Sequence, residues 1–205
     1  MDVVWYKNPL KHLKKLAISQ PPHDILLSFD GNNGPRFSPS SANSGFFYAR
    51  NSSRSRYLFI ALMYAGDQIM ECGSHQQVLI SLINEHSSLF GLRSKILSGK
   101  DFLGGFHFHR DKVAMKNVIL QKTLPFIFHM SWTNDKTNKV LYLKQMGLWF
   151  VIEECANLGH FEIETEKSTS CCSKEPLFSC HYKDKPSLKP CLDSPTIDKN
   201  GVSFW

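Results

Sequence analysis

The stretch Asp2-Val3-Val4-Trp5-Tyr6-Lys7-Asn8-Pro9, residues 2–9, decides the fold. The apolar residues after the aspartate predict a short β-strand with an acidic residue at one end and a turn at the other. Such a strand has to pair with other strands to satisfy its backbone hydrogen bonds. The pattern is typical of the interior of an α/β domain. Because only Met1 precedes it, we expect a domain that is truncated at its amino terminus.

The remaining periodicity extends this prediction along the chain. Apolar residues at helical spacing predict helices over residues 10–18, 53–66, 74–83, 112–120 and 138–152, and short apolar runs predict strands over 24–29, 43–49 and 125–129. Alternating strands and helices indicate an α/β fold with a mixed, mostly parallel sheet flanked by helices. The composition changes after about residue 154, so we expect one domain over 1–153 and an irregular, cysteine-rich extension over 154–205 packed on it.

Composition bounds the class of protein. The 205 residues are 42% hydrophobic and 20% charged, which favours a folded domain. The net charge of +6 comes from scattered lysines and arginines, which fit either a phosphorylated or acidic ligand or ordinary solvated surface. We expect no nucleic-acid partner, because no basic-aromatic stripe is present. No run of 18 apolar residues predicts a transmembrane helix, and no phosphate loop, Rossmann glycine motif or serine-hydrolase elbow appears.

Five of the six cysteines lie in the last quarter of the chain, at positions 155, 171, 172, 180 and 191. Two readings are open, disulfides or a zinc site that includes His181. The short paired spacing that zinc sites prefer is missing, so we favour disulfides and therefore a secretory lumen. The single sequon Asn51-Ser52-Ser53 is compatible with that compartment.

Residues 2–9 resemble a segment of the nucleotide-diphospho-sugar transferase family that reads roughly Asp-x-Asp-Val-Val-Trp-x-x-Asn-Pro, of which only the second aspartate, Asp2, is present. The resemblance extends through residues 30–49 and 125–149. It implies a GT-A-like glycosyltransferase fold that uses Mn²⁺ or Mg²⁺ and takes a nucleotide-diphosphate sugar donor of the uridine type. It also implies a glycan or glycoprotein acceptor in the Golgi or secretory lumen. Membrane attachment would come only from an anchor upstream of residue 1.

The resemblance implies a cation site. Asp2 stands at a strand end, where a carboxylate can hold a hard divalent cation, although a surface aspartate is the simpler interpretation of such a residue alone. His129 ends the apolar run 125–129 and is expected to complete the coordination, with Lys136 and Lys139 on the diphosphate. The alternative for His129 is a buried, hydrogen-bonded histidine, and the glycine usual after the family's histidine is not found here.

A second implied group lines the donor sugar. Asn43, Ser44 and Gly45 match the family's small-residue motif, in which Asn43 could bind a sugar hydroxyl and Gly45 allows a close backbone approach. We assign Gln76 and Asn43 to orienting donor or acceptor at the catalytic centre. His75 stands where relatives tend to have an aspartate. The alternatives are a plain turn before a strand and an ordinary polar helix start.

Two interpretations remain less specific. His107 and His109 alternate, which would place both on one face of a strand, and a polar strand facing the acceptor is favoured over a metal pair. The alternative function is a truncated or inactive transferase-like domain that binds a glycan or a protein. No residue stands out as a catalytic base or nucleophile.

Overall fold

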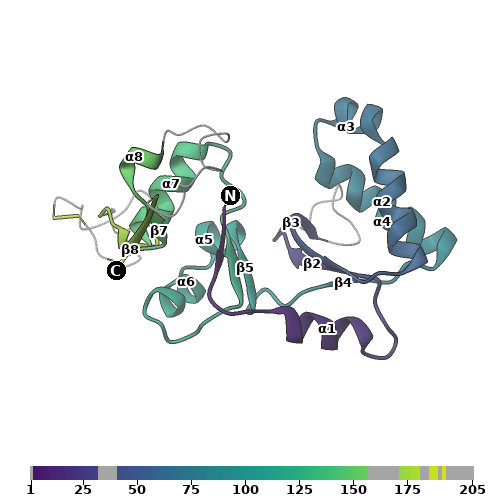
Figure 1. Cartoon of the computed structure of the whole chain (residues 1–205), viewed down its shortest axis with the longest axis horizontal. Coiled ribbons are helices and arrows are strands. Elements are labelled where there is room, and N and C mark those ends of the chain that lie inside the picture. The colour runs from purple at the N-terminus through teal and green to yellow at the C-terminus, as the bar shows by residue number, and fades with distance from the viewer. Residues whose placement is uncertain (1, 32–40, 157–170, 181–184, 189–190, 193–205) are drawn as a thin grey trace. The chain divides into compact units, whose positions relative to one another are not determined.

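The structure, a computed structural model, describes residues 2–31, 41–156, 171–180, 185–188 and 191–192 (Figure 1). The chain folds into two compact units. The first consists of residues 1–107 and 124–132, and the second of residues 108–123 and 133–205. The boundary expected at residue 154 stays a prediction. Within the described part of the chain, no helix combines the length and the apolar character needed to cross a bilayer.

One three-stranded sheet of the first unit is built around strand β2 (Ile25–Phe29). Strand β3 (Ala42–Ala49) lies antiparallel on one side of β2, and β4 (Ser94–Ile96) lies parallel on the other. The first three residues of β2 are completely buried. A continuous apolar run of this kind is what a strand needs when both faces of its sheet are covered.

Helices cover both faces of this sheet (Figure 1). Helix α1 (Leu10–Ile18) packs Leu13 and Ala17 in one cluster with Leu26. The side chains on either side of Leu26 in β2 point to the opposite face, where helices α2 (Ser53–Tyr64), α3 (Gly66–Cys72) and α4 (His75–Phe90) pack against them. The alternation of side chains along one short strand therefore divides the core between two helical layers.

A second three-stranded sheet of the first unit has the order β1-β6-β5. Strand β6 (Ile127–His129) lies between β1 (Val3–Trp5), which is antiparallel to it, and β5 (Phe102–Gly104), which is parallel. The strand predicted from residues 2–9 is thus confirmed. It pairs with β6, which ends at the predicted metal ligand His129. Each of the two sheets combines a parallel with an antiparallel pair, so the mixed α/β class is confirmed without a parallel majority among the described strands.

The second unit holds helices α6 (Lys112–Ile119), α7 (Lys136–Gln145) and α8 (Glu153–Ala156), and the antiparallel pair β7 (Trp149–Val151) and β8 (Cys172–Leu177). The single helix predicted over 138–152 is wrong in its second half. Helix α7 ends because Gly147 adopts a left-handed conformation with φ +68°, and the apolar residues that follow form β7 instead.

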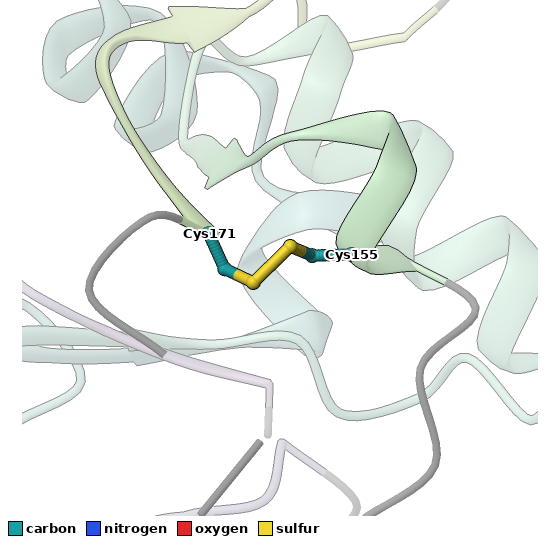
Figure 2. Close-up of a disulfide and its surroundings, with 2 residues drawn as sticks. All are labelled: Cys155 and Cys171. Carbon is teal, nitrogen blue, oxygen red and sulfur yellow. A yellow bond between two sulfur atoms is a disulfide. The ribbon is translucent and has the colours of Figure 1, made fainter. Parts of the chain in front are cut away.

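The prediction of disulfides is confirmed by two bonds, Cys155–Cys171 and Cys180–Cys191. Figure 2 shows the first, which joins helix α8 to the residue immediately before strand β8. The two other cysteines, Cys72 and Cys172, are free and exposed. The expected zinc partner of the alternative interpretation, His181, lies outside the described residues.

Candidate functional site

The two predicted metal ligands come together although they are far apart in the sequence. Strand β1 pairs with β6 so that Val3 lies opposite His129, and the backbone N–H of Met130 donates to the carbonyl of Asp2 at 2.8 Å. Asp2 itself precedes β1, and its Oδ1 lies 3.5 Å from His129 Nε2. The His129 side chain is only 9% exposed, whereas that of Asp2 is 29% exposed. The pair therefore lies where β1 begins and β6 ends, with one buried and one accessible member.

Gly45 lies directly against the His129 ring. A Cβ atom added to Gly45 would lie 2.1 Å from His129 Cε1 and 2.7 Å from Nε2, far inside van der Waals contact. Only glycine fits there, because any side chain would displace the imidazole. Strand β3, which carries Gly45, thus brings its backbone to the nitrogen that faces Asp2.

Asn43 holds Gly45 in this place. Its Oδ1 accepts a hydrogen bond from the Gly45 N–H at 2.8 Å, and its Nδ2 donates to Asp30 Oδ1 at 2.7 Å. Asn43 and Asp30 are 5% and 6% exposed. The Asp30 N–H donates to the Ser41 carbonyl at 2.9 Å, and the next residue, Gly31 (φ +83°), lies directly against the Phe106 side chain. Both residues fall in the range 30–49 of the family resemblance, but the sequence does not predict the hydrogen bond between Asn43 and Asp30. Its only signal for that bond is a lone aspartate after an apolar strand.

Ser44, His75 and Gln76 form a polar contact between β3 and the start of α4. The Ser44 N–H donates to Gln76 Oε1 at 3.0 Å, and the Ser44 hydroxyl lies 3.2 Å from the same oxygen. His75 Nε2 lies 3.0 Å from that hydroxyl. Helix α4 begins here because Ser74 caps it, accepting from the Gln77 N–H. The structure therefore places Gln76 next to the predicted donor-lining residues, while its catalytic role stays a prediction.

Asp2 and His129 have the right chemistry for a divalent cation. A carboxylate oxygen and an imidazole nitrogen both suit Mn²⁺, and Mg²⁺ prefers the oxygen. Asp2 Oδ1 and His129 Nε2 lie 3.5 Å apart, so the two side chains would hold such a cation together. Among the residues that the structure describes, no group of three or more His, Cys, Asp or Glu side chains is arranged to hold a metal. Donor phosphate oxygens and water would supply further ligands.

The paired-histidine prediction is wrong about the backbone. Residues 105–110 form helix α5 (Gly105–Arg110), so side chains two apart diverge and do not share a face. His107 Nδ1 accepts from the Gly104 N–H at 3.1 Å, and His109 Nε2 lies 3.1 Å from Thr133 Oγ1. Burial, with smaller contributions from the nearby charges of Lys185 and Arg110, lowers the pKa of His109. Both histidines therefore have structural contacts of their own.

Lys136 and Lys139, predicted to meet the diphosphate, lie in the first turns of α7 in the second compact unit. Helix α7 starts there because the Asp135 side chain caps it, accepting from two backbone N–H groups. The contact of either lysine with a donor stays a prediction.

An open pocket of about 490 Å³ follows strand β1 and is lined by residues 5–9. Trp5 is 56% exposed and packs edge-to-face on Phe46, with ring centroids 5.7 Å apart. Burial raises the pKa of Tyr6 to about 12, so this phenol stays neutral. Exposed aromatic rings next to amide and hydroxyl groups are well suited to the apolar and polar faces of a sugar ring.

Comparison with known families gives one match. The model of the nucleotide-diphospho-sugar transferase family matches residues 1–143, which include Asp2, Asn43, Gly45 and His129. Comparisons with curated proteins and with solved structures found no match. The matched range covers more than half of the sequence and contains both strands that bring Asp2 to His129, and so the chain belongs to the nucleotide-diphospho-sugar transferase family.

Proposed function

We propose that the protein is a GT-A-type glycosyltransferase that moves a sugar from a uridine-diphosphate donor to a glycan or glycoprotein acceptor, assisted by Mn²⁺ or Mg²⁺. The observation that carries the proposal is the meeting of Asp2 Oδ1 and His129 Nε2 at 3.5 Å, from opposite ends of the matched family region. The two disulfides support a secretory compartment, such as the Golgi lumen, because such bonds persist in oxidising surroundings.

The proposal assigns a task to each candidate residue. Asp2 and His129 would hold the cation, which when bound offsets the negative charge of the departing diphosphate. Gly45 keeps the space beside His129 open, and Asn43 fixes the Gly45 backbone. Ser44 and Gln76 orient the donor sugar or the acceptor, and Lys136 or Lys139 assists at the diphosphate. Trp5 offers an exposed ring for the acceptor.

The test is calorimetric titration of uridine diphosphate into the full chain with and without Mn²⁺. We expect binding that needs Mn²⁺ and that weakens at least about tenfold, or ~1.4 kcal/mol, in Asp2→Asn and in His129→Ala. Asp67→Asn is the matched control, because Asp67 is an exposed aspartate on helix α3. Binding that ignores Mn²⁺, or that survives both substitutions in folded protein, contradicts the proposed cation site.

One observation favours a second candidate, a transferase-like domain that binds without catalysing transfer. His75 occupies the place where an aspartate is expected, and its Nε2 is engaged with the Ser44 hydroxyl at 3.0 Å. A histidine held in this way supplies no carboxylate near the reacting sugar. In that case the same candidate residues would bind a glycan or a donor without turning it over.

Turnover separates the two candidates. The wild-type chain and His75→Asp are incubated with uridine-diphosphate sugars and Mn²⁺, and release of uridine diphosphate is measured. The transferase reading expects release by the wild-type chain, which Asp2→Asn abolishes. The binding-module reading expects metal-dependent binding by calorimetry without release, and a gain of release only in His75→Asp.

A further inference from the structure

The sequon Asn51-Ser52-Ser53 spans the end of the connection between strand β3 and helix α2 and the first residue of α2. Asn51 and Ser53 are exposed, and the Asn51 side chain has no hydrogen bond to any residue in the described part of the chain. The middle residue, in contrast, is anchored. Its hydroxyl donates to Asp24 Oδ1 at 2.8 Å, and it caps helix α2 by accepting from the Ser55 N–H at 3.1 Å. The connection is therefore held by Ser52, while the two residues that define the sequon point outward.

An apolar groove lies next to Asn51. It is an open pocket of about 450 Å³ whose lining includes Asn51, Phe59, Ile60 and Met63. Ile60 and Met63 expose 50% and 82% of their surface, and Phe59 is backed by the stacked ring of Phe47 at 5.5 Å. Covering this apolar surface would stabilise the protein, because each Å² of apolar surface that is removed from water contributes about 25 cal/mol. The C–H faces of a sugar ring attached to Asn51 can cover it.

We propose that Asn51 is an N-linked glycosylation site whose first sugars pack against the α2 groove. In the modification, Asn51 Nδ2 forms a bond to the anomeric carbon of a lipid-diphosphate-linked oligosaccharide. The bond from that carbon to the diphosphate oxygen breaks, the lipid diphosphate leaves, and one amide proton passes to a base of the host's oligosaccharide transferase. The proposal uses none of the residues assigned to sugar transfer.

The compartment agrees with this chemistry. Cys155–Cys171 and Cys180–Cys191 are disulfides, which form where secretory proteins are glycosylated. Asn51 belongs to the first compact unit, whereas both disulfides belong to the second. The disulfides and the sequon are therefore independent signs of the same environment.

The test directs the full chain into endoplasmic-reticulum membranes behind a cleavable signal sequence and scores only chains protected from added protease. We expect a mass increase of one glycan, which peptide-N-glycosidase removes while converting residue 51 to aspartate, as read by peptide mass spectrometry. Asn51→Gln and Ser53→Ala lose the glycan, and Ser53→Thr keeps it. Asn138→Gln, an exposed asparagine on α7 outside any sequon, leaves it unchanged. Protected, disulfide-bonded wild-type chain without sugar at residue 51 overturns the proposal.

The contact with the groove has its own readout. Binding of an apolar fluorescent dye is compared between the glycosylated chain and unglycosylated Asn51→Gln, whose side chain at residue 51 is likewise uncharged. We expect weaker dye binding to the glycosylated chain, and a smaller difference when Met63→Ser is added to both. Equal dye binding in the two forms contradicts the packing of the sugars on α2.

Discussion

At the residue scale, the geometry of the candidate cation site depends on the close contact between Gly45 and the His129 ring. Gly45→Ala places a methyl group where His129 Cε1 and Nε2 now lie, so the imidazole has to move away from Asp2. We expect Mn²⁺-dependent binding of uridine diphosphate to weaken at least about tenfold, while the chain stays folded. Calorimetry measures the binding, and circular dichroism checks the fold.

Gly66→Ala is the matched control for this substitution. No atom lies within 4 Å of a Cβ added to Gly66, and its backbone does not adopt a left-handed conformation. Its effect on binding should be negligible, and alanine at the start of α3 should stabilise that helix slightly. Equal binding by both variants would contradict the assignment of Gly45 as the spacer beside His129.

A buried carboxylate connects several elements of the first unit. Asp24 is completely buried just before β2 and accepts hydrogen bonds from Arg50 Nη2 at 2.9 Å, Ser52 Oγ at 2.8 Å and the Arg93 N–H at 3.0 Å. Arg54 Nη1 lies 3.5 Å away. The carboxylate thus connects the end of β3, the start of α2 and the residue before β4 to the start of β2.

Burial alone would raise the pKa of Asp24, but hydrogen bonds from Ser52, Arg93 and Arg50 and the charge of Arg54 outweigh it, so the pKa is lowered from 3.8. Because the folded pKa is the lower one, this stabilisation is complete above pH 3.8 and is lost as the pH falls through the folded pKa. We expect Asp24→Asn to lower the free energy of unfolding by about 3 kcal/mol at pH 7, since it removes the buried negative charge that these donors surround and replaces one acceptor oxygen with an NH₂ group.

Urea unfolding at pH 7 and below pH 3.8 measures both parts of this prediction. The difference between Asp24→Asn and the wild-type chain should shrink at the lower pH. Glu71→Gln, an exposed acid on α3, should change the free energy by less than about 0.5 kcal/mol at either pH. A difference for Asp24→Asn that is constant with pH would contradict the role of its charge.

The bond between Cys155 and Cys171 is the second element-scale connection, because it fixes helix α8 to the start of β8 (Figure 2). It closes a loop with a sequence separation of 16 residues, for which the loss of chain entropy in the unfolded state corresponds to about 3 kcal/mol. We expect Cys155→Ser with Cys171→Ser to increase amide exchange in β7 and β8 and leave exchange in β2 unchanged. Hydrogen–deuterium exchange measures this, and equal protection of β7 and β8 in both proteins would count against it.

Whether the second unit takes part in donor binding is a question at the scale of the whole molecule. The proposed cation ligands belong to the first unit, whereas Lys136 and Lys139 belong to the second. If these lysines contact the diphosphate, Lys136→Ala with Lys139→Ala should raise the Kd for uridine diphosphate about tenfold, or ~1.4 kcal/mol, in the presence of Mn²⁺. Lys14→Ala with Lys15→Ala, on the exposed side of α1, is the control of equal charge. Equal titrations for the two double variants would remove the second unit from the donor site.

The sequence by itself determined the α/β class, the strand after Asp2, most helices and the disulfide character of the tail, because these follow from local periodicity and from cysteine content. It also identified Asp2, Gly45 and His129 one by one through the family resemblance. Local sequence patterns predicted the wrong element where a glycine conformation or strand pairing determines the backbone. At Gly147 the expected helix stops, and β7 begins shortly after it.

Only the tertiary structure decided which of these residues meet. The pairing of β1 with β6 places Asp2 across from Met130, next to His129. Because Asp2 precedes β1, its side chain does not follow the alternation of that strand and lies 3.5 Å from His129 Nε2. The pairing of Asn43 with Asp30 and the approach of Gly45 to the imidazole likewise join segments that no sequence spacing connects. The physical reason is that periodicity specifies which face of a strand is buried, whereas the partner on that face is chosen by packing of the whole unit.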